Sequence, residues 1–412
     1  MNPNYFLSTK KAWLSACLFI FMPHYAYSHG LETAEVGTFL DASLAATWRD
    51  EGANLESPSS PWQIPGALMG GEAFAVEEGV SLDDANLVLR HFNQNGIYGL
   101  IQISTHSNGD QAEVHHAFAG YRWQHGDVRI NAEAGRMAGM FSPFNPEHAS
   151  TRLFSESAIA MDVFLGRQLN DEGMRASVRW QGWMIGAEGW RGSGFPATPG
   201  DGGGAVDVFG HYQWSNDKIQ IHTGAWWLQA DALDRIDNRY SSGHSHGTTV
   251  VQTPEWFFSG ETTLTGVFVR TRWQLAKQWN LLFDAQWIEQ TVEGILADSS
   301  RIADLKADNN GGWIQPGIQY GNHTVALRWE ELILENALTG AGAEDLVQTA
   351  NLQHQSSDPS RLGVVYYWQS NSNIALRVEW TQDDTLLDQD GEGSDRFALG
   401  VVWNLTQNLA FD

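Results

Sequence analysis

The chain has 412 residues, of which 24 are basic and 49 acidic, so its formal net charge at pH 7 is -25. A charge of this sign argues against binding nucleic acid or other phosphate-rich partners through bulk attraction, and favours cations near the exposed surface. The single cysteine, Cys17, excludes disulfides and thiolate metal sites from the chain that follows it.

The first 28 residues show the order of features that is typical of a secretory signal peptide. Lys10 and Lys11 precede an apolar run over residues 12–22, and Ala26-Tyr27-Ser28 provides a small-x-small cleavage site. A run of about eleven residues is too short to span a bilayer. We predict a signal peptide over residues 1–28 and one mature domain over residues 29–412.

Short polar turns recur along the mature chain. Seven are predicted, at residues 93–96, 124–127, 170–173, 215–218, 276–278, 320–322 and 370–373. Between successive turns lie two strand-like runs joined by a longer connection rich in Gly, Pro and acid. Seven turns therefore join fourteen strands, and one further strand at each end gives 16. Short turns at one end and long loops at the other are typical of an outer-membrane barrel.

The expected strands, in chain order, are 37–49, 84–92, 97–105, 111–123, 127–137, 158–169, 173–190, 204–214, 218–229, 260–275, 279–291, 312–320, 322–334, 361–369, 373–383 and 395–411. The segment 173–190 is either one projecting strand or two strands. Counts of about 14 to 18 strands therefore stay open.

Alternation of apolar and polar residues supports these strands. It is weak over residues 37–49, clear over residues 128–134 and 279–287, and clearest where Ile374, Leu376, Val378 and Trp380 share one face. A soluble β-sandwich would also alternate, but it does not explain a belt of Trp, Phe and Leu in nearly every strand. The predicted fold class is all-β, a transmembrane antiparallel β-barrel of about 16 strands.

The polar face of each strand is expected to line the lumen. An arginine on the lipid face near the membrane midplane costs roughly 2 to 4 kcal/mol, whereas the lumen tolerates it. By this phase, the predicted lining residues are Arg90, Arg129, Glu133, Arg175, Arg179, Arg270, Arg272, Arg328, Glu330, Arg377 and Glu379.

The long connections are expected at residues 50–83, 106–110, 138–157, 191–203, 230–259, 292–311, 335–360 and 384–394. Many carry acid, which indicates either an anionic mouth above the lumen or an ordinary solvated surface. The third connection has two prolines and two aromatic residues. We expect it to fold inward as a constriction loop formed by Phe141, Phe144, Glu147 and His148.

Several motifs resemble those of a known family. They are Tyr98-Gly99-Leu100-Ile101-Gln102-Ile103-Ser104, Ala117-Phe118-Ala119-Gly120-Tyr121, Ala134-Gly135-Arg136, residues 141–148, Phe164-Leu165-Gly166 and Asn170-Asp171-Glu172-Gly173. Together they resemble a porin-like outer-membrane family often associated with zinc-uptake systems. The resemblance covers roughly residues 97–180, and it implies a barrel linked to zinc supply. Unlike the His-rich version of the third loop, this loop has only His148.

A candidate metal site lies in one later connection, where Asp231, Asp234, His244 and His246 cluster. His-x-His is a plausible ligand pair for a borderline metal. A polar surface loop is the alternative. His115 and His116 are a weaker candidate, because adjacent residues of a strand point to opposite faces. No cofactor is expected.

We do not expect an enzyme. His106 and Ser107 invite comparison with barrel phospholipases, but these place the two residue types one residue apart, on one strand face. The sequence instead favours a passive channel for small hydrophilic solutes or ions, surrounded by outer-membrane lipid and lipopolysaccharide, with a homotrimer as the common assembly of porins. The competing class is a non-conducting barrel for metal capture, adhesion or envelope structure.

Overall fold

The computed structural model describes residues 36–409 except residues 56–59, 107–111, 199–203, 238, 240–255, 356 and 389. The predicted signal peptide, Ser107, His244 and His246 therefore lie outside the described residues. Neither helix in the described part of the chain combines the length and hydropathy needed to cross a membrane.

Strands dominate the described residues, and two short helices interrupt them. The elements are β1 (Gly37–Arg49), β2 (Gly79–Phe92), β3 (Ile97–His106), β4 (Glu113–His125), β5 (Val128–Ala138), α1 (Ile159–Leu165), β6 (Asn170–Trp180), β7 (Trp183–Trp190), β8 (Gly204–Ser215), β9 (Ile219–Arg235), β10 (Phe257–Ala276), β11 (Trp279–Ala297), β12 (Ile302–Tyr320), β13 (His323–Ile333), β14 (Asn336–Thr339), α2 (Ala343–Thr349), β15 (Ser360–Gln369), β16 (Ile374–Asp383) and β17 (Ser394–Asn408).

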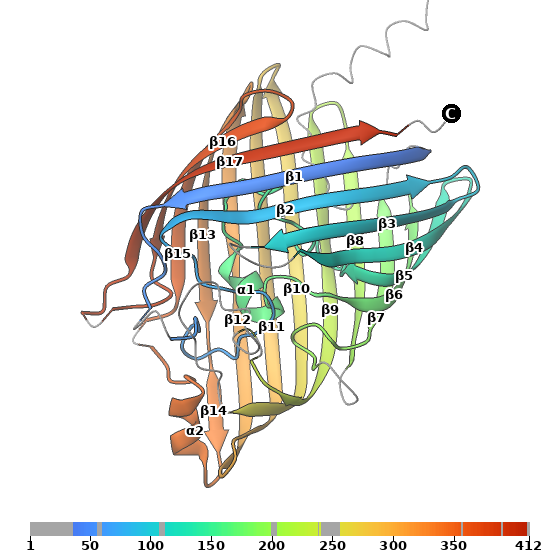
Figure 1. The fold of residues 1–412 in the computed structure, drawn as a ribbon. Helices are drawn as coiled ribbons and strands as arrows, with labels where there is room; N and C mark the ends of the chain where they lie inside the picture. Colours follow the sequence, from blue (N-terminus) through green and yellow to red (C-terminus); the bar gives the residue numbers. More distant parts are fainter. Residues whose placement is uncertain are drawn as a thin grey trace, which may run out of the picture.

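The strands close into a barrel (Figure 1). β1 pairs antiparallel with β2 on one side and with β17 on the other, so no wall strand is left as an edge. β14 pairs with the protruding end of β12, while β13 pairs directly with β15. The wall is therefore a closed antiparallel barrel of 16 strands, which confirms the predicted fold class and strand number.

Two errors in the strand assignment cancel in that number. The predicted strand 158–169 is instead α1 with its flanks, and the predicted turn 170–173 is the beginning of β6. The segment 173–190 is divided between β6 and β7. Their turn is made by Gln181 and Gly182, both with positive φ (47° and 93°), as a two-residue hairpin turn requires. One strand is lost and one is gained.

The barrel wall is taller on one side. β10, β11 and β12 have 20, 19 and 19 residues, whereas β3 and β7 have 10 and 8. The predicted long connection 292–311 is wrong, because β11 and β12 continue through it to a short turn at residues 298–301. Asp298 Oδ1 accepts hydrogen bonds from the backbone N–H of Ser300 and of Arg301 there.

The outer face of the barrel is apolar. On β11, Trp279 and Trp287 are 42% and 36% exposed. Eight residues at about 3.3 Å each separate them by roughly 26 Å along the strand. At a strand tilt of about 40° this corresponds to a rise of roughly 20 Å, so both rings fit near the edges of an apolar band about 25 Å tall.

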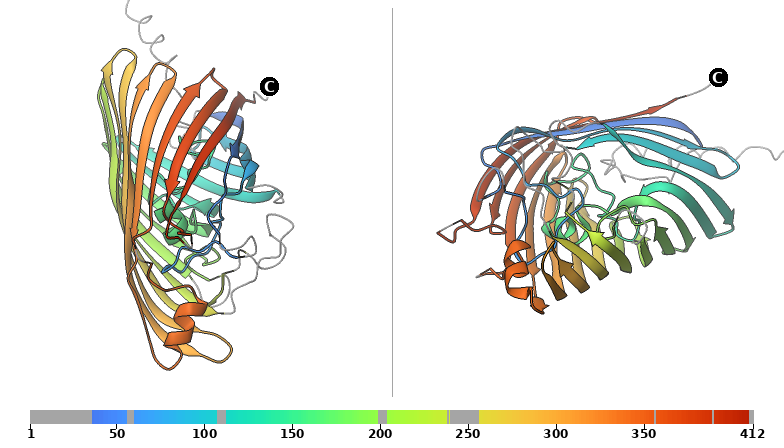
Figure 2. Two further views of the ribbon diagram at one scale, coloured as in Figure 1. Left: turned by 90° about the vertical axis from the view of Figure 1, so that its left-hand side faces the viewer. Right: turned by 60° about the horizontal axis from the view of Figure 1, so that its bottom comes forward.

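The inside of the barrel is filled in part by chain that enters from the loop end. α1 lies within the ring of strands (Figure 2). The segments 62–73 and 137–169 form one buried apolar cluster together with side chains of the wall strands. A second cluster forms where α2 packs near the projecting ends of β10 to β12. The core therefore sits inside the barrel, between the wall and the inserted segments.

Candidate functional site

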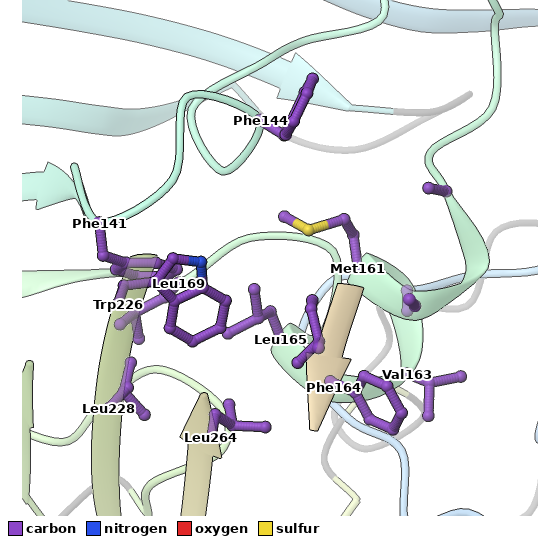
Figure 3. Packing of buried hydrophobic residues seen from close by; sticks show 14 of the residues in the cluster. Phe141, Phe144, Met161, Val163, Phe164, Leu165, Leu169, Trp226, Leu228 and Leu264 are labelled. Carbon is purple, nitrogen blue, oxygen red and sulfur yellow. The ribbon is translucent and has the colours of Figure 1, made fainter. Parts of the chain in front are cut away.

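The connection between β5 and β6, residues 139–169, folds into the barrel; we call it the inward loop. Its Phe141 is fully buried, with its ring centroid 4.7 Å from that of Trp226 on β9. Phe144 lies 5.1 Å from Trp313 on β12 and 6.3 Å from Phe268 on β10. Figure 3 shows Phe141 beside Trp226, with Leu165 at the end of α1 in the same cluster. The inward loop thus contacts wall strands that are distant in the sequence.

Charged side chains of the wall hold the backbone of the inward loop. Carboxylates of the wall accept hydrogen bonds from loop N–H groups: Glu188 from Met140 (2.9 Å), Asp84 from Ser150 (3.0 Å), Glu379 from Ser155 (2.9 Å) and Glu330 from Ile159 (2.6 Å). Buried N–H groups need such partners. The wall acids therefore supply hydrogen-bond acceptors for loop N–H groups that do not pair with a neighbouring strand.

Glu147 of the inward loop forms an ion pair with Arg270 on β10, a wall strand that is distant in the sequence. Its carboxylate lies 2.6 Å from the Arg270 guanidinium, which also pairs with Asp284 at 3.1 Å. The same guanidinium lies over the ring of Phe144, 4.5 Å from the centroid. Burial raises the pKa of Glu147, and Arg270 opposes that shift. The structure thus brings together three of the predicted site residues.

A second charged group lies further along the inward loop. Glu156 pairs with Arg361 (3.2 Å) and with Arg396 (3.1 Å), and both arginines also pair with Asp383. Burial alone would raise the pKa of Glu156, but the two guanidinium groups hold it below its usual range. Sequence analysis missed these residues, because Arg361 and Arg396 stand at the strand ends, where the alternation begins.

The predicted lining residues all lie on the face opposite the exposed apolar side chains, but in two environments. One set is buried and hydrogen-bonded beneath the inserted segments: Glu133, Arg175, Arg328, Glu330, Arg377 and Glu379. The other set is half-buried and lies closer to the short turns: Arg90, Arg129, Arg179, Arg270 and Arg272. A role in lining a conducting pore stays a prediction for both sets.

Arg175 illustrates the buried environment. It pairs with Glu133 and, at 2.9 Å, with Glu188, and it donates to the carbonyl oxygen of Ala138 at 3.2 Å. Tyr98 donates to the other side of the Glu133 carboxylate at 2.8 Å. Glu188 also receives the Met140 N–H, so this network joins the wall to the start of the inward loop.

The predicted metal loop is only partly described. Asp231 is in β9 and exposed, and Asp234 is exposed with its backbone N–H donating to Ser259 Oγ at 2.8 Å. Their predicted partners His244 and His246 lie outside the described residues. The predicted metal site in this loop therefore stays a prediction. The candidate catalytic pair is similarly incomplete, because His106 ends β3 and Ser107 is not described.

His115 and His116 do not point to opposite faces, and that prediction is wrong. In the pairing of β3 with β4, Gln102 lies opposite His116 and Ile103 opposite Val114, so His115 is an extra residue in the strand. Such a β-bulge disrupts the alternation of side chains. Both rings are completely buried, and with His148 they form a group whose ligand nitrogens all lie within 4.8 Å of one another.

No family model and no curated protein matches the chain. Among solved structures, a loop-deletion mutant of OmpT, an outer membrane protein of Vibrio cholerae, has a TM-score of 0.52 at 9% identity, covering 90% of this chain and 100% of that one. OmpT folded in vitro, in a trimer form, has a TM-score of 0.50 at 10% identity, with coverage of 90% and 100%.

Salmonella typhi OmpF, in complex with daunomycin, has a TM-score of 0.50 at 12% identity, covering 89% of this chain and 97% of that one. The fold is a porin-like barrel. At these identities the likeness extends to the fold alone, so the function rests on the geometry of this chain.

Proposed function

We propose that the chain is an outer-membrane channel that lets small hydrophilic solutes or ions diffuse passively. The observation that carries this proposal is a closed 16-strand wall whose outer face is apolar and whose inner face bears charge. A closed barrel satisfies all of its backbone hydrogen bonds within the wall, as lipid requires. Charged inner walls sort solutes by sign and size.

The inner face near the short turns carries positive charge. Arg90, Arg129, Arg179 and Arg272 lie there, half-buried, and Arg90 pairs with Asp41 at 2.7 Å. The loops at the other end carry much of the acid of the sequence. A solute would thus meet an acidic mouth first and basic side chains later. We propose weak selectivity by charge.

The finer parts of the proposal concern zinc and assembly. A link to zinc supply is supported by the motif resemblance over residues 97–180. A homotrimer is supported by the trimer form of OmpT, whose fold is similar. Outer-membrane lipid and lipopolysaccharide are the proposed partners, because an apolar outer face suits contact with lipid. Growth and expression under zinc limitation test the first part, and sedimentation in detergent tests the second.

A second candidate function is a non-conducting barrel. The observation in its favour is the apolar cluster inside the wall, where Phe141, Phe144 and Phe164 pack with Trp226 and Trp313. Apolar contacts of this kind exclude water from the part of the cross-section that they occupy. A barrel closed in this way would serve capture, adhesion or envelope structure.

Single-channel conductance in planar bilayers separates the two candidates. We expect discrete conductance steps from the folded protein, and larger steps when Phe141 and Phe144 are both replaced by alanine. The control is Trp287→Ala, which removes an aromatic ring from the outer face and leaves the lumen unchanged. A folded protein that never conducts, with or without the double substitution, contradicts the channel.

A further inference from the structure

Three histidines from two separate segments meet inside the barrel; we call them the histidine cluster. His115 and His116 come from β4, and His148 comes from the inward loop. His115 Nδ1 lies 3.1 Å from His116 Nε2, and the ring centroid of His148 lies 5.0 Å from that of His115. The exposed fractions are 0%, 0% and 7%.

A bulge in β4 and a tight turn in the inward loop position these three rings. The bulge in β4 turns both neighbouring histidines inward, which a regular strand does not allow. Asn170 Nδ2 donates to the carbonyl oxygen of His115 at 3.0 Å, which fixes the bulge. His148 begins a tight turn in which its carbonyl oxygen accepts from the N–H of Thr151 at 2.9 Å. Both sides of the cluster are therefore held before any ligand arrives.

We propose that the histidine cluster binds one divalent transition-metal ion of the zinc class. Zinc takes imidazole nitrogens at about 2.0 to 2.1 Å, which in a tetrahedron places the nitrogens roughly 3.4 Å apart. The cluster already has one pair at 3.1 Å, and all three ligand atoms lie within 4.8 Å. Small side-chain rotations bring the third nitrogen into range.

The donor set decides the class of metal. Three imidazoles without a carboxylate suit zinc, copper or nickel and do not suit calcium or magnesium, which prefer oxygen ligands. Three protein ligands leave a fourth position for water or a small anion. Gln102 Nε2 lies 3.2 Å from His148 Nε2 and orients the His148 ring.

The metal would act as a clamp between the wall and the inward loop. His115 and His116 belong to the wall, whereas His148 lies one residue from Glu147, which contacts Arg270 on β10. A ligand that binds only when both parts are in place stabilises that arrangement by mass action. Metal binding thus holds the inward loop across the barrel. This inference is independent of whether the barrel conducts.

The test uses the full chain, folded in detergent, stripped with a chelator and titrated calorimetrically with Zn²⁺. Co²⁺ serves as a second probe, because its visible absorption reports tetrahedral coordination by nitrogen. We expect one ion per chain. Replacing His148 with glutamine weakens binding by at least ~100-fold, since even partners outside the ligand shell contribute 10 to 100-fold.

Two control variants share the chemistry but not the site. His211→Gln with His222→Gln removes a histidine pair elsewhere inside the barrel, one ring buried and the other half-buried, whose nitrogens lie 3.4 Å apart. His244→Gln with His246→Gln removes the other predicted ligand pair. We expect both to retain one bound ion. Heat-modified mobility on gels verifies folding, and His148→Gln, which changes no strand residue, decides the matter if His115→Gln with His116→Gln does not fold.

The proposal fails if the folded wild-type protein takes up no ion. It also fails if His148→Gln binds as tightly as the wild type, or if binding disappears only in the variant that lacks His244 and His246. A bound Co²⁺ that keeps an octahedral spectrum in the wild type would equally contradict a three-histidine site.

Discussion

Arg377 is a fully enclosed charge of the inner wall. Its side chain has no exposed area, and it pairs with Asp83 (2.9 Å) and Glu379 (3.2 Å) while donating to the Ala149 carbonyl oxygen (3.0 Å). Phase along β16 alone suggests a lining residue that tolerates charge reversal. Its burial implies that charge reversal is not tolerated, because the Arg377 side chain fastens the inward loop to the wall.

Arg377→Glu should therefore destabilise the barrel and not only change ion selectivity. Losing one partner of a buried ion pair costs about 3 to 5 kcal/mol. The measurement is the temperature at which the folded gel band disappears, together with conductance. Arg90→Glu is the control, since Arg90 is half-buried and pairs with Asp41 near the short turns. Equal stability of the two variants would rule out the fastening role.

Glu156 gives a prediction about pH. Its folded pKa lies below that of a free carboxyl, because Arg396 and Arg361 outweigh the effect of burial. A depressed pKa adds stability that is complete above the unfolded value, about 4.3, and is lost as the pH falls through the folded value. Glu156→Gln should thus be less stable than wild type at pH 7, and the gap should narrow below about pH 4. Thermal unfolding at several pH values measures it; a constant gap contradicts the ion pairing.

At the scale of elements, the β6–β7 hairpin depends on Gly182. A Cβ there would lie 2.4 Å from the Gln213 carbonyl oxygen, and φ is +93°. Gly126 also has positive φ (+58°), but a Cβ there would meet nothing within 4 Å. Gly182→Ala should lower the yield of folded barrel clearly, while Gly126→Ala should cost only the strain of about 1 kcal/mol. Refolding yield measures the difference, and equal yields would show that the close approach is unimportant.

Alternation could identify the wall strands, but not α1. Ile159, Met161, Val163 and Leu165 alternate as a strand would, yet Ala160 and Phe164 between them are buried too. A short apolar run inside a barrel does not reveal its own conformation. The bulge at His115 was equally hidden, because it is a property of the register between β3 and β4. The histidine cluster needs His148 as well, which follows 32 residues after His116 and whose position only tertiary structure determines.

At the scale of the molecule, the apolar outer face sets the membrane position. Leu376 is 40% exposed on this face, next to the enclosed Arg377. Leu376→Arg should reduce insertion into vesicles, since arginine near the midplane costs roughly 2 to 4 kcal/mol. Leu376→Met is the control. If the arginine variant inserts as readily as the methionine variant, this face does not meet lipid.

The closed wall could be predicted as a whole because most strands carry their own alternating pattern and most short turns their own composition. The filling of the lumen could not. Phe141 meets Trp226, which lies 85 residues further along the chain, and Glu147 meets Arg270. Such contacts depend on how the whole ring closes, and no local pattern encodes them.

The unequal height of the wall has a consequence at the cell surface. A transmembrane strand needs about 9 to 11 residues, so β10 to β12, with 19 or 20 residues each, continue well past the lipid headgroups on one flank. On that flank the wall projects beyond the rest of the barrel, and α2 packs near the projecting strand ends. In the proposed channel, solutes that arrive at the loop end would therefore enter more easily over the opposite flank, where the wall strands are shorter.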